Sequence, residues 1–262
     1  MSTFIDRLDS GIVAGTSVID WSCPVPFFGD LNTARIATVG INPSNLEFVD
    51  GFGQELKGGN RRLPTLNSLG REKWSEIDGG QLVEIVSACR GYFNANPYDR
   101  WFRVLEDMLR HTSTTFYGSK PGACHIDLVP YATAAKWGSL PPAERRKLLT
   151  ATSDALGFLL RDSGIQLLVL NGRSVVRHFE GMANIKLTEH RMDSWSLPRG
   201  NGAHIPGFAY TGEVQVLGGV HLPTPIRVLG YNHNLQSSFG VTGAVVSNIA
   251  RWLGGEARMV AA

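Results

Sequence analysis

Short apolar runs alternate with amphipathic segments along most of the chain. Strand-type runs bounded by glycine, proline or other turn residues occupy positions 36–39, 124–129, 165–170, 214–217 and 226–229. Between them, apolar positions recur with a helical period in residues 100–112, 141–164, 173–182 and 241–255. Because strands that alternate with helices build a mostly parallel sheet covered on both faces, this pattern predicts an α/β fold with three αβα layers.

The segment 45–95 interrupts this alternation. It is rich in glycine and mixed charge, and a helical period is visible only in residues 81–89. With 262 residues, 43% of them hydrophobic, the chain is long enough for one well-buried domain with insertions. We therefore expect a single domain over residues 1–262, with 45–95 as an insertion that caps the site.

Composition indicates the cellular environment of the protein but does not identify its reaction. The net charge of +2 permits nucleic-acid binding through local patches without arguing for it. No apolar stretch approaches the ~20 residues of a membrane span, and the first residues do not resemble a secretory signal, so a cytoplasmic protein is expected. The three cysteines are isolated, which favours neither a disulfide framework nor a metal or iron–sulfur site.

Polar residues follow several of the strand-type runs. In parallel α/β sheets, ligands bind at the carboxyl ends of the strands. The first run continues as GINPS (40–44), the second contains Asp127, the third continues as NGRS (171–174) and the last as GYNHNLQSS (230–238). None of these loops has a P-loop or GxGxxG pattern, so no nucleotide cofactor is predicted.

The order of these segments resembles the uracil-DNA glycosylase superfamily. GINP resembles the family's first motif, a strand followed by Gly-x-(Asn/Asp)-Pro, in the form of its mismatch-specific branch. The other matching segments are NPYDRWFRVLEDML (96–109), LLVLNGRSV (167–175) and NHNLQSS (232–238). The similarity covers residues 24–253 in order, with 45–95 unmatched. The last motif lacks its Pro-Ser, and the cysteine ligands of the iron–sulfur branches are absent.

The resemblance implies a monofunctional DNA glycosylase, which flips a base out of the stack and hydrolyses its N-glycosidic bond to leave an abasic site. At the matched positions Asn42 would hold the attacking water, and Ile41 would contact the base or sugar. An amide orients water but is a poor base, so slower hydrolysis is expected than with a carboxylate. An Asn-Pro pair also commonly forms a simple turn, which is the structural alternative.

Asp127 bears on the identity of the base. The family commonly has an asparagine at this position, which reads uracil. A carboxylate only accepts hydrogen bonds, so it would repel uracil O4, accept from the N4 amino group of cytosine and stabilise a protonated N3. We therefore expect a modified cytosine, for example the glucosylated hydroxymethylcytosine of some phage DNA, in a defence role. The alternatives are uracil or deaminated-base repair, and an Asp127 that pairs with a basic residue or caps a loop.

The resemblance implies roles for several further residues. Asn232 or His233 would donate to the base O2 as charge develops on the leaving group. Phe93 or Tyr92 would stack on the flipped base, although each is equally expected in the core. Asn171 is interpreted as structural.

Another set of residues would contact the DNA backbone or the stack. Leu235 or Gln236 would wedge into the gap left by the base. The candidate phosphate contacts are Ser44, Lys136, Arg173, Ser174 and Ser237, with the pair Arg61 and Arg62 as an addition. Basic residues 145–147 are interpreted as a solvated helix face.

Two other classes of function remain open. One is a nucleic-acid-binding module that has kept the fold and lost hydrolysis. The other is hydrolysis of free nucleosides. For the leading interpretation, DNA is the expected partner and the protein is expected to be a monomer without a membrane association, metal or cofactor.

Overall fold

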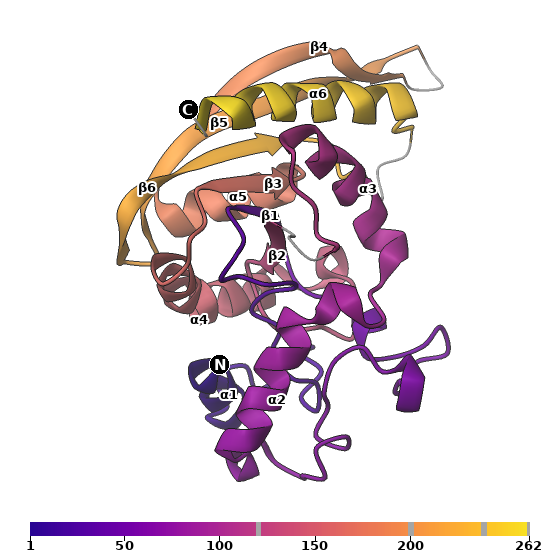
Figure 1. The fold of residues 1–262 in the computed structure, drawn as a ribbon, viewed down its shortest axis with the longest axis vertical. Helices are drawn as coiled ribbons and strands as arrows, with labels where there is room; N and C mark the ends of the chain where they lie inside the picture. The colour runs from indigo at the N-terminus through magenta and orange to yellow at the C-terminus, as the bar shows by residue number, and fades with distance from the viewer. Residues whose placement is uncertain (119–121, 199–201, 237–239, 261–262) are drawn as a thin grey trace.

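A six-stranded sheet forms the centre of the protein in the computed structural model, which describes residues 1–118, 122–198, 202–236 and 240–260. The strand order is β2-β1-β3-β6-β5-β4 (Figure 1). The strands are β1 (Ile36–Gly40), β2 (Ala123–Asp127), β3 (Leu167–Asn171), β4 (Thr188–Pro198), β5 (His204–Leu217) and β6 (Val220–Tyr231).

Helices cover both faces of this sheet. The α-helices are α1 (Ser2–Asp9), α2 (Gly79–Arg90), α3 (Asp99–Leu109), α4 (Pro142–Arg161), α5 (Arg173–Ala183) and α6 (Gly243–Val260), and α3 to α6 are the ones that flank the sheet. The helices α4 and α5 pack together and against the strands, and α3 and α6 form the other helical layer (Figure 1). This arrangement confirms the predicted three-layer α/β fold with a mostly parallel sheet.

The parallel part of the sheet consists of β2, β1, β3 and β6. Ile36 of β1 lies opposite Ala123 of β2 and Leu167 of β3, and all three strands run in the same direction. Every residue of β1, β2 and β3 is buried. Parallel strands that are covered on both faces need continuous apolar sequence, which explains why the sequence pattern located them.

The antiparallel part of the sheet was only partly predicted. The strands β5 and β6 form a long hairpin, of which the sequence pattern predicted only residues 214–217 and 226–229. The hairpin turn includes Gly218, whose φ of +56° suits glycine and whose missing Cβ would lie 2.3 Å from the backbone of Ser153. Edge strand β4 was missed because it is mostly exposed and polar. The apolar signal of such a strand is weak.

The insertion 45–95 contains more structure than the one expected helix. Besides α2, which begins with a capping box between Asp78 and Gln81, it has short 3-10 turns, including η1 (Asn45–Glu47) and η4 (Tyr92–Asn94). Figure 1 shows α2 next to α1, at the end of the molecule away from β4. Helix α1 was not predicted from the sequence.

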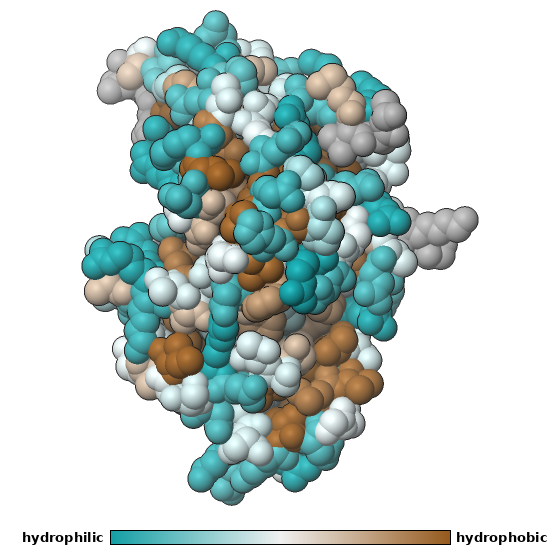
Figure 2. Space-filling model, turned by 90° about the vertical axis from the view of Figure 1, so that its left-hand side faces the viewer, coloured by the Kyte–Doolittle hydropathy of each residue, from teal (hydrophilic) through white to brown (hydrophobic). Residues whose placement is uncertain are grey.

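Polar and apolar side chains are mixed on the surface. Figure 2 shows polar side chains over most of one face, with separate apolar areas between them. The most exposed large apolar side chains are those of Phe52, Met259 and Val83. In the described ranges, no helix combines the length and the apolar character needed to cross a membrane. The three cysteines are buried as free thiols.

Candidate functional site

A cleft of about 620 Å³ opens where the parallel strands end. Loop residues 40–45 after β1, 133–139 beyond β2, and 171–175 after β3 line it, together with Asn232 and Asn234 after β6. Trp101 of α3 and Arg145 of α4 complete the lining. Strand ends that are far apart in the sequence therefore meet at one edge of the sheet, as predicted.

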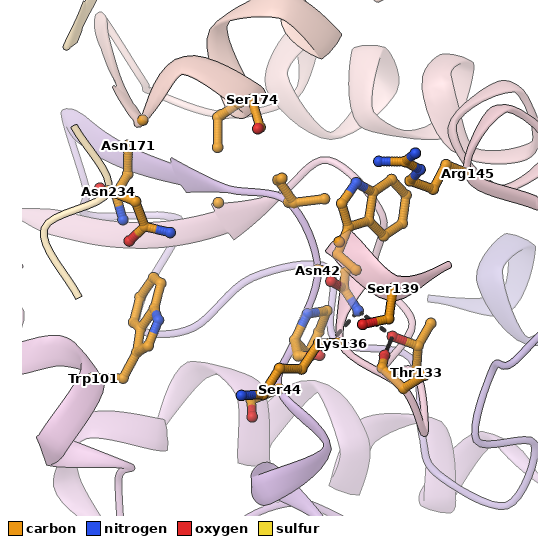
Figure 3. Close-up of a pocket in the computed structure, with 18 of the residues that line it drawn as sticks. Asn42, Ser44, Trp101, Thr133, Lys136, Ser139, Arg145, Asn171, Ser174 and Asn234 are labelled. Carbon is orange, nitrogen blue, oxygen red and sulfur yellow. Dashed lines mark hydrogen bonds between the residues drawn. The ribbon is translucent and has the colours of Figure 1, made fainter. Parts of the chain in front are cut away.

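Asn42 lies at the centre of this cleft, in the turn predicted for the Asn-Pro pair. Its amide nitrogen donates to Thr133 Oγ1 at 3.0 Å, to the carbonyl oxygen of Pro43 at 3.2 Å and to that of Tyr131 at 3.3 Å. Figure 3 shows the nitrogen directed at Thr133 and the oxygen on the opposite side. The amide orientation is therefore fixed, and Oδ1 is left to accept a hydrogen bond from a water or a ligand.

The labelled side chains form two groups around Asn42 in Figure 3. Trp101, Asn171 and Asn234 lie on one side, and Thr133, Lys136, Ser139 and Arg145 lie on the other. The first group is aromatic and amide in character. The second carries hydroxyls and positive charge. The two ends of the cleft therefore differ in what they can bind.

A smaller recess of about 50 Å³ adjoins the cleft and shares part of its wall. Both are lined by Asn42, Pro43, Ser44 and Trp101. The recess is lined in addition by aromatic rings and ionisable groups, namely Phe28, Phe102, Glu47, His125 and Asp127. A flat group that enters from the cleft would thus meet aromatic walls and carboxyl groups.

Asp127 is held at the recess by a chain of hydrogen bonds. Its Oδ1 lies 3.3 Å from His125 Nε2, and His125 Nδ1 lies 2.8 Å from Thr38 Oγ1. With the Thr38 hydroxyl donating to Nδ1, the hydrogen on Nε2 points to Asp127. A Cβ at Gly40 would lie 2.3 Å from Asp127 Oδ1, so the glycine of the first motif makes room for this carboxylate. His125 was not singled out from the sequence.

Glu47 is a second carboxyl group at the recess, and sequence reasoning missed it. It is only 3% exposed, and Tyr92 Oη donates to its Oε2 at 2.6 Å. Burial raises the pKa of Glu47 to about 7, although the hydrogen bond from Tyr92 and the charge of Arg62 lower it. The negative charge of Asp127 is a smaller contribution to this raised pKa. The available signal was its position five residues after Asn42, in a segment that looked like a surface loop.

Positive charge is concentrated at the other end of the cleft. Lys136 lies there, and the other described candidates for phosphate contact, Ser44, Arg173 and Ser174, also line the cleft; their contact with phosphate stays a prediction. Arg145 lines it as well and is half-buried, so its interpretation as part of a solvated face was wrong. By contrast, the neighbouring residues 146 and 147 are exposed.

These cations are available to an external anion. Within the described ranges, none of Lys136, Arg145 and Arg173 forms an ion pair with an acidic side chain. Trp137 also lines this end of the cleft, and its buried indole Nε1 has no hydrogen-bond partner in the described part of the chain. Buried donors in proteins are normally paired, so this indole nitrogen is an exception.

The last motif is placed differently from the prediction. Asn232 Oδ1 accepts from the backbone N–H of Phe208, and its Nδ2 donates to the carbonyl of Pro206, both at 2.8 Å. His233 is buried with Nε2 2.7 Å from the carbonyl oxygen of Trp195. Both side chains therefore tie the end of β6 to β4 and β5. The predicted contact with the base is wrong for His233, which lines neither the cleft nor the recess, and stays a prediction for Asn232. Asn232 and Asn234 both line the cleft.

The two predicted wedge residues pack against or bond to the body of the protein. Leu235 is part of the hydrophobic core. Gln236 accepts from Asn171 Nδ2 at 2.9 Å, and Asn171 Oδ1 accepts from Tyr231 at 3.0 Å. This network supports a structural role for Asn171 and leaves neither wedge candidate projecting from the loop. Ser237 lies outside the described residues.

The predicted stacking residues lie in the core. Phe93 stacks on Phe116 with ring centroids 4.6 Å apart, and Tyr92 reaches the recess only through its bond to Glu47. Neither lines the cleft, so their predicted stacking on the base was wrong. Ile41 does line the cleft, as expected, and Trp101 is the aromatic side chain shared by the cleft and the recess.

The remaining basic candidates lie outside the cleft. Arg62 donates to the carbonyl oxygen of Leu46 and lies over the ring of Tyr98, and neither Arg61 nor Arg62 lines the cleft. Their predicted contribution to the groove was therefore wrong.

No group of His, Cys, Asp and Glu suited to a metal ion occurs among the described residues. No protein-family model matches the chain, and no curated protein sequence is significantly similar to it. The fold and the cleft define an α/β protein with a polar site at the carboxyl ends of its parallel strands. Any narrower class rests on the chemistry of that site.

Proposed function

We propose that this protein is a monofunctional DNA glycosylase, which hydrolyses the N-glycosidic bond of a base held in the recess. The observation that carries the proposal is the fixed Asn42 amide at the junction of cleft and recess. A base that entered the recess from the cleft would leave its sugar beside Asn42. A water bound to Asn42 Oδ1 would then be positioned to attack C1′ as the bond to the base breaks.

The carboxylate of Asp127 favours a base with an exocyclic amino group. His125 occupies one side of this carboxylate, and its other lone pairs can accept from a ligand in the recess. Cytosine offers the N4 amino group as a donor, whereas uracil offers the O4 carbonyl, which a carboxylate repels. The function we propose is therefore excision of a modified cytosine. The polar cleft provides space for a substituent that projects from the base.

The second group of cleft residues suits the sugar-phosphate backbone. Lys136 and Arg145 supply positive charge and form no ion pair within the described residues, and Thr133 and Ser139 supply hydroxyls; Arg173 and Ser174 line the cleft as well. Most contacts of DNA-binding proteins are made to phosphates by such groups. A base in the recess and its phosphates at this end would extend across the cleft on the two sides of Asn42.

Mass spectrometry of released bases tests the proposal. The purified protein would be incubated with DNAs that carry cytosine, glucosylated hydroxymethylcytosine or uracil. We expect release of the modified cytosine and little uracil. Asn42→Ala should abolish release and retain DNA binding, while Asn94→Ala, which changes an exposed asparagine, should behave as the wild type.

Two results would contradict parts of the proposed function. Asp127→Asn should shift preference towards uracil, because an amide both donates and accepts. If base preference is unchanged in this variant, Asp127 does not read the base. If the wild type binds DNA but releases no base from any of these DNAs, the protein is a nucleic-acid-binding module rather than an enzyme.

A further inference from the structure

Glu47 presents one unused oxygen to the recess. Its Oε2 accepts from Tyr92 Oη, and the Tyr92 oxygen in turn accepts from the backbone N–H of Tyr98 at 2.8 Å. Among the described residues, Oε1 has no hydrogen-bond partner, although the side chain is 3% exposed. This oxygen is not among the fully buried unpaired atoms of the described residues, so it is partly accessible, and Glu47 lines the recess.

The surroundings of Glu47 favour its neutral form. Arg62 is the nearest compensating charge, but it is engaged with the carbonyl of Leu46 and the ring of Tyr98. Asp127 contributes a like charge across the recess. The outcome is a pKa of about 7, so Glu47 carries its proton through the weakly acidic range and exchanges it near neutrality. With Tyr92 donating to Oε2, that proton resides on Oε1.

We propose that Glu47 is the general acid of the reaction, and that its Oε1–H hydrogen-bonds to a ring nitrogen of the base and protonates it as the glycosidic bond breaks. The inference rests on the proposed glycosylase function. It adds a catalytic residue and specifies which hydrogen-bonding edge the base must present. Asp127 accepts from an exocyclic amino group while Glu47 donates to the adjacent ring nitrogen. This pair fits the amidine edge of a cytosine, N4–H and N3, and disfavours uracil, whose N3 carries a hydrogen.

The step balances without a co-reactant. The electron pair of the C1′–N1 bond moves into the base, the proton of Glu47 Oε1 moves to N3, and the base departs as a neutral molecule. The water at Asn42 bonds to C1′ and releases one proton to solvent, and the Glu47 carboxylate regains a proton from solvent. One water is consumed per bond. Cytosine is a poor leaving group as an anion, so protonation is the step that a cytosine-type base requires.

The groups that face Glu47 define the expected pH dependence. They are Tyr92 and Tyr98 on the insertion side, Arg62, and the pair His125 and Asp127 on β2. Burial raises the pKa of Tyr92 well above its ordinary value, so Tyr92 stays a donor throughout. Loss of the Glu47 proton above its pKa should therefore slow release about tenfold per pH unit.

Single-turnover release of the modified base between pH 5.5 and 9 tests the role. Glu47→Gln keeps an acceptor for Tyr92 and a donor for the base but cannot transfer a proton. We expect it to slow release about 10²-fold or more below pH 7, to remove the fall above pH 7, and to leave DNA affinity nearly unchanged. Glu72→Gln, an exposed glutamate of the same insertion, should reproduce the wild-type profile.

A second variant separates acid catalysis from packing. The hydrogen bond from Tyr92 lowers the pKa of Glu47, so Tyr92→Phe should move the fall in rate to higher pH. A base that carries an electron-withdrawing substituent leaves more easily and should shrink the defect of Glu47→Gln. A purely structural role would slow both substrates equally and would not move the profile.

The outcomes distinguish this role from the proposed function itself. If the wild type releases base and Glu47→Gln keeps both its rate and its pH dependence, Glu47 is not the acid and the glycosylase proposal stands. If Tyr92→Phe releases base with an unshifted profile, the acid is a different group. If the wild type releases no base from any DNA, the glycosylase proposal and this role both fall.

Discussion

Replacement of Arg145 tests whether the charged end of the cleft binds phosphates. Three cations line the cleft, Lys136, Arg145 and Arg173, and none is neutralised by an ion pair within the described chain. Each phosphate that is neutralised in duplex DNA contributes about 0.9 to the slope of log affinity against log salt. If every cation meets one phosphate, the wild-type slope is about −2.7 and that of Arg145→Ala is about −1.8.

These slopes give a measurable difference. Between 50 and 200 mM salt, affinity should fall roughly 40-fold for the wild type and roughly 12-fold for Arg145→Ala. Fluorescence anisotropy with a labelled duplex measures both. The matched control is Arg146→Ala, because this neighbouring residue on α4 is exposed and does not line the cleft. Its slope should equal that of the wild type.

Equal slopes for Arg145→Ala and the wild type would refute phosphate binding at this end of the cleft. Equal reductions for Arg145→Ala and Arg146→Ala would show that the effect reports the overall charge of the protein. A loss of affinity without a change of slope would mean that Arg145 shapes the cleft rather than neutralising a phosphate.

Three further predictions concern the recess. Gly40→Ala should abolish base release and lower the free energy of unfolding, measured by urea denaturation, by about 1–3 kcal/mol, because the new Cβ would lie 2.3 Å from Asp127 Oδ1. The control Gly51→Ala, whose new Cβ meets no atom within 4 Å, should change neither base release nor stability. Trp101→Ala should weaken binding to DNA that holds the target base by about 1–3 kcal/mol and hardly affect binding to abasic DNA, if Trp101 stacks on the base. Glu47 has a pKa of about 7 in the folded protein against 4.5 in the unfolded chain, so its contribution to stability is full below pH 4.5 and lost as pH rises through 7. Wild-type unfolding free energy should therefore fall by about 3 kcal/mol more than that of Glu47→Gln between pH 4.5 and pH 8, and parallel curves for the two proteins would contradict a raised pKa.

The fold could be predicted wherever burial on both sides left a continuous apolar run. The strands β1, β2 and β3 are of this kind, and their ends were located within two residues. Strand β4 faces solvent along most of its length, so its sequence carries the polar pattern of a loop. Its position depends on pairing with β5, a contact that no local pattern encodes.

The site could be predicted where a functional residue directly follows a strand. Asn42 and Arg173 each lie two residues beyond the end of a parallel strand, so the strand-end rule placed both at the cleft, and their function stays a prediction. The last motif failed for a different reason. The polar side chains of Asn232 and His233 satisfy backbone groups of β4 and β5, and those partners became visible only with the antiparallel hairpin.

The two carboxyl groups of the recess illustrate how one cavity can hold both a donor and an acceptor. The sheet supplies Asp127 with a hydrogen bond from His125, which is backed by Thr38. The insertion supplies Glu47 with burial and a single phenol, and the charge of Asp127 then opposes a second charge beside it. The acceptor state of one carboxylate thus helps to maintain the donor state of the other. In the proposed reaction, reading an amidine edge requires this asymmetry, and the insertion would contribute to the chemistry through Glu47.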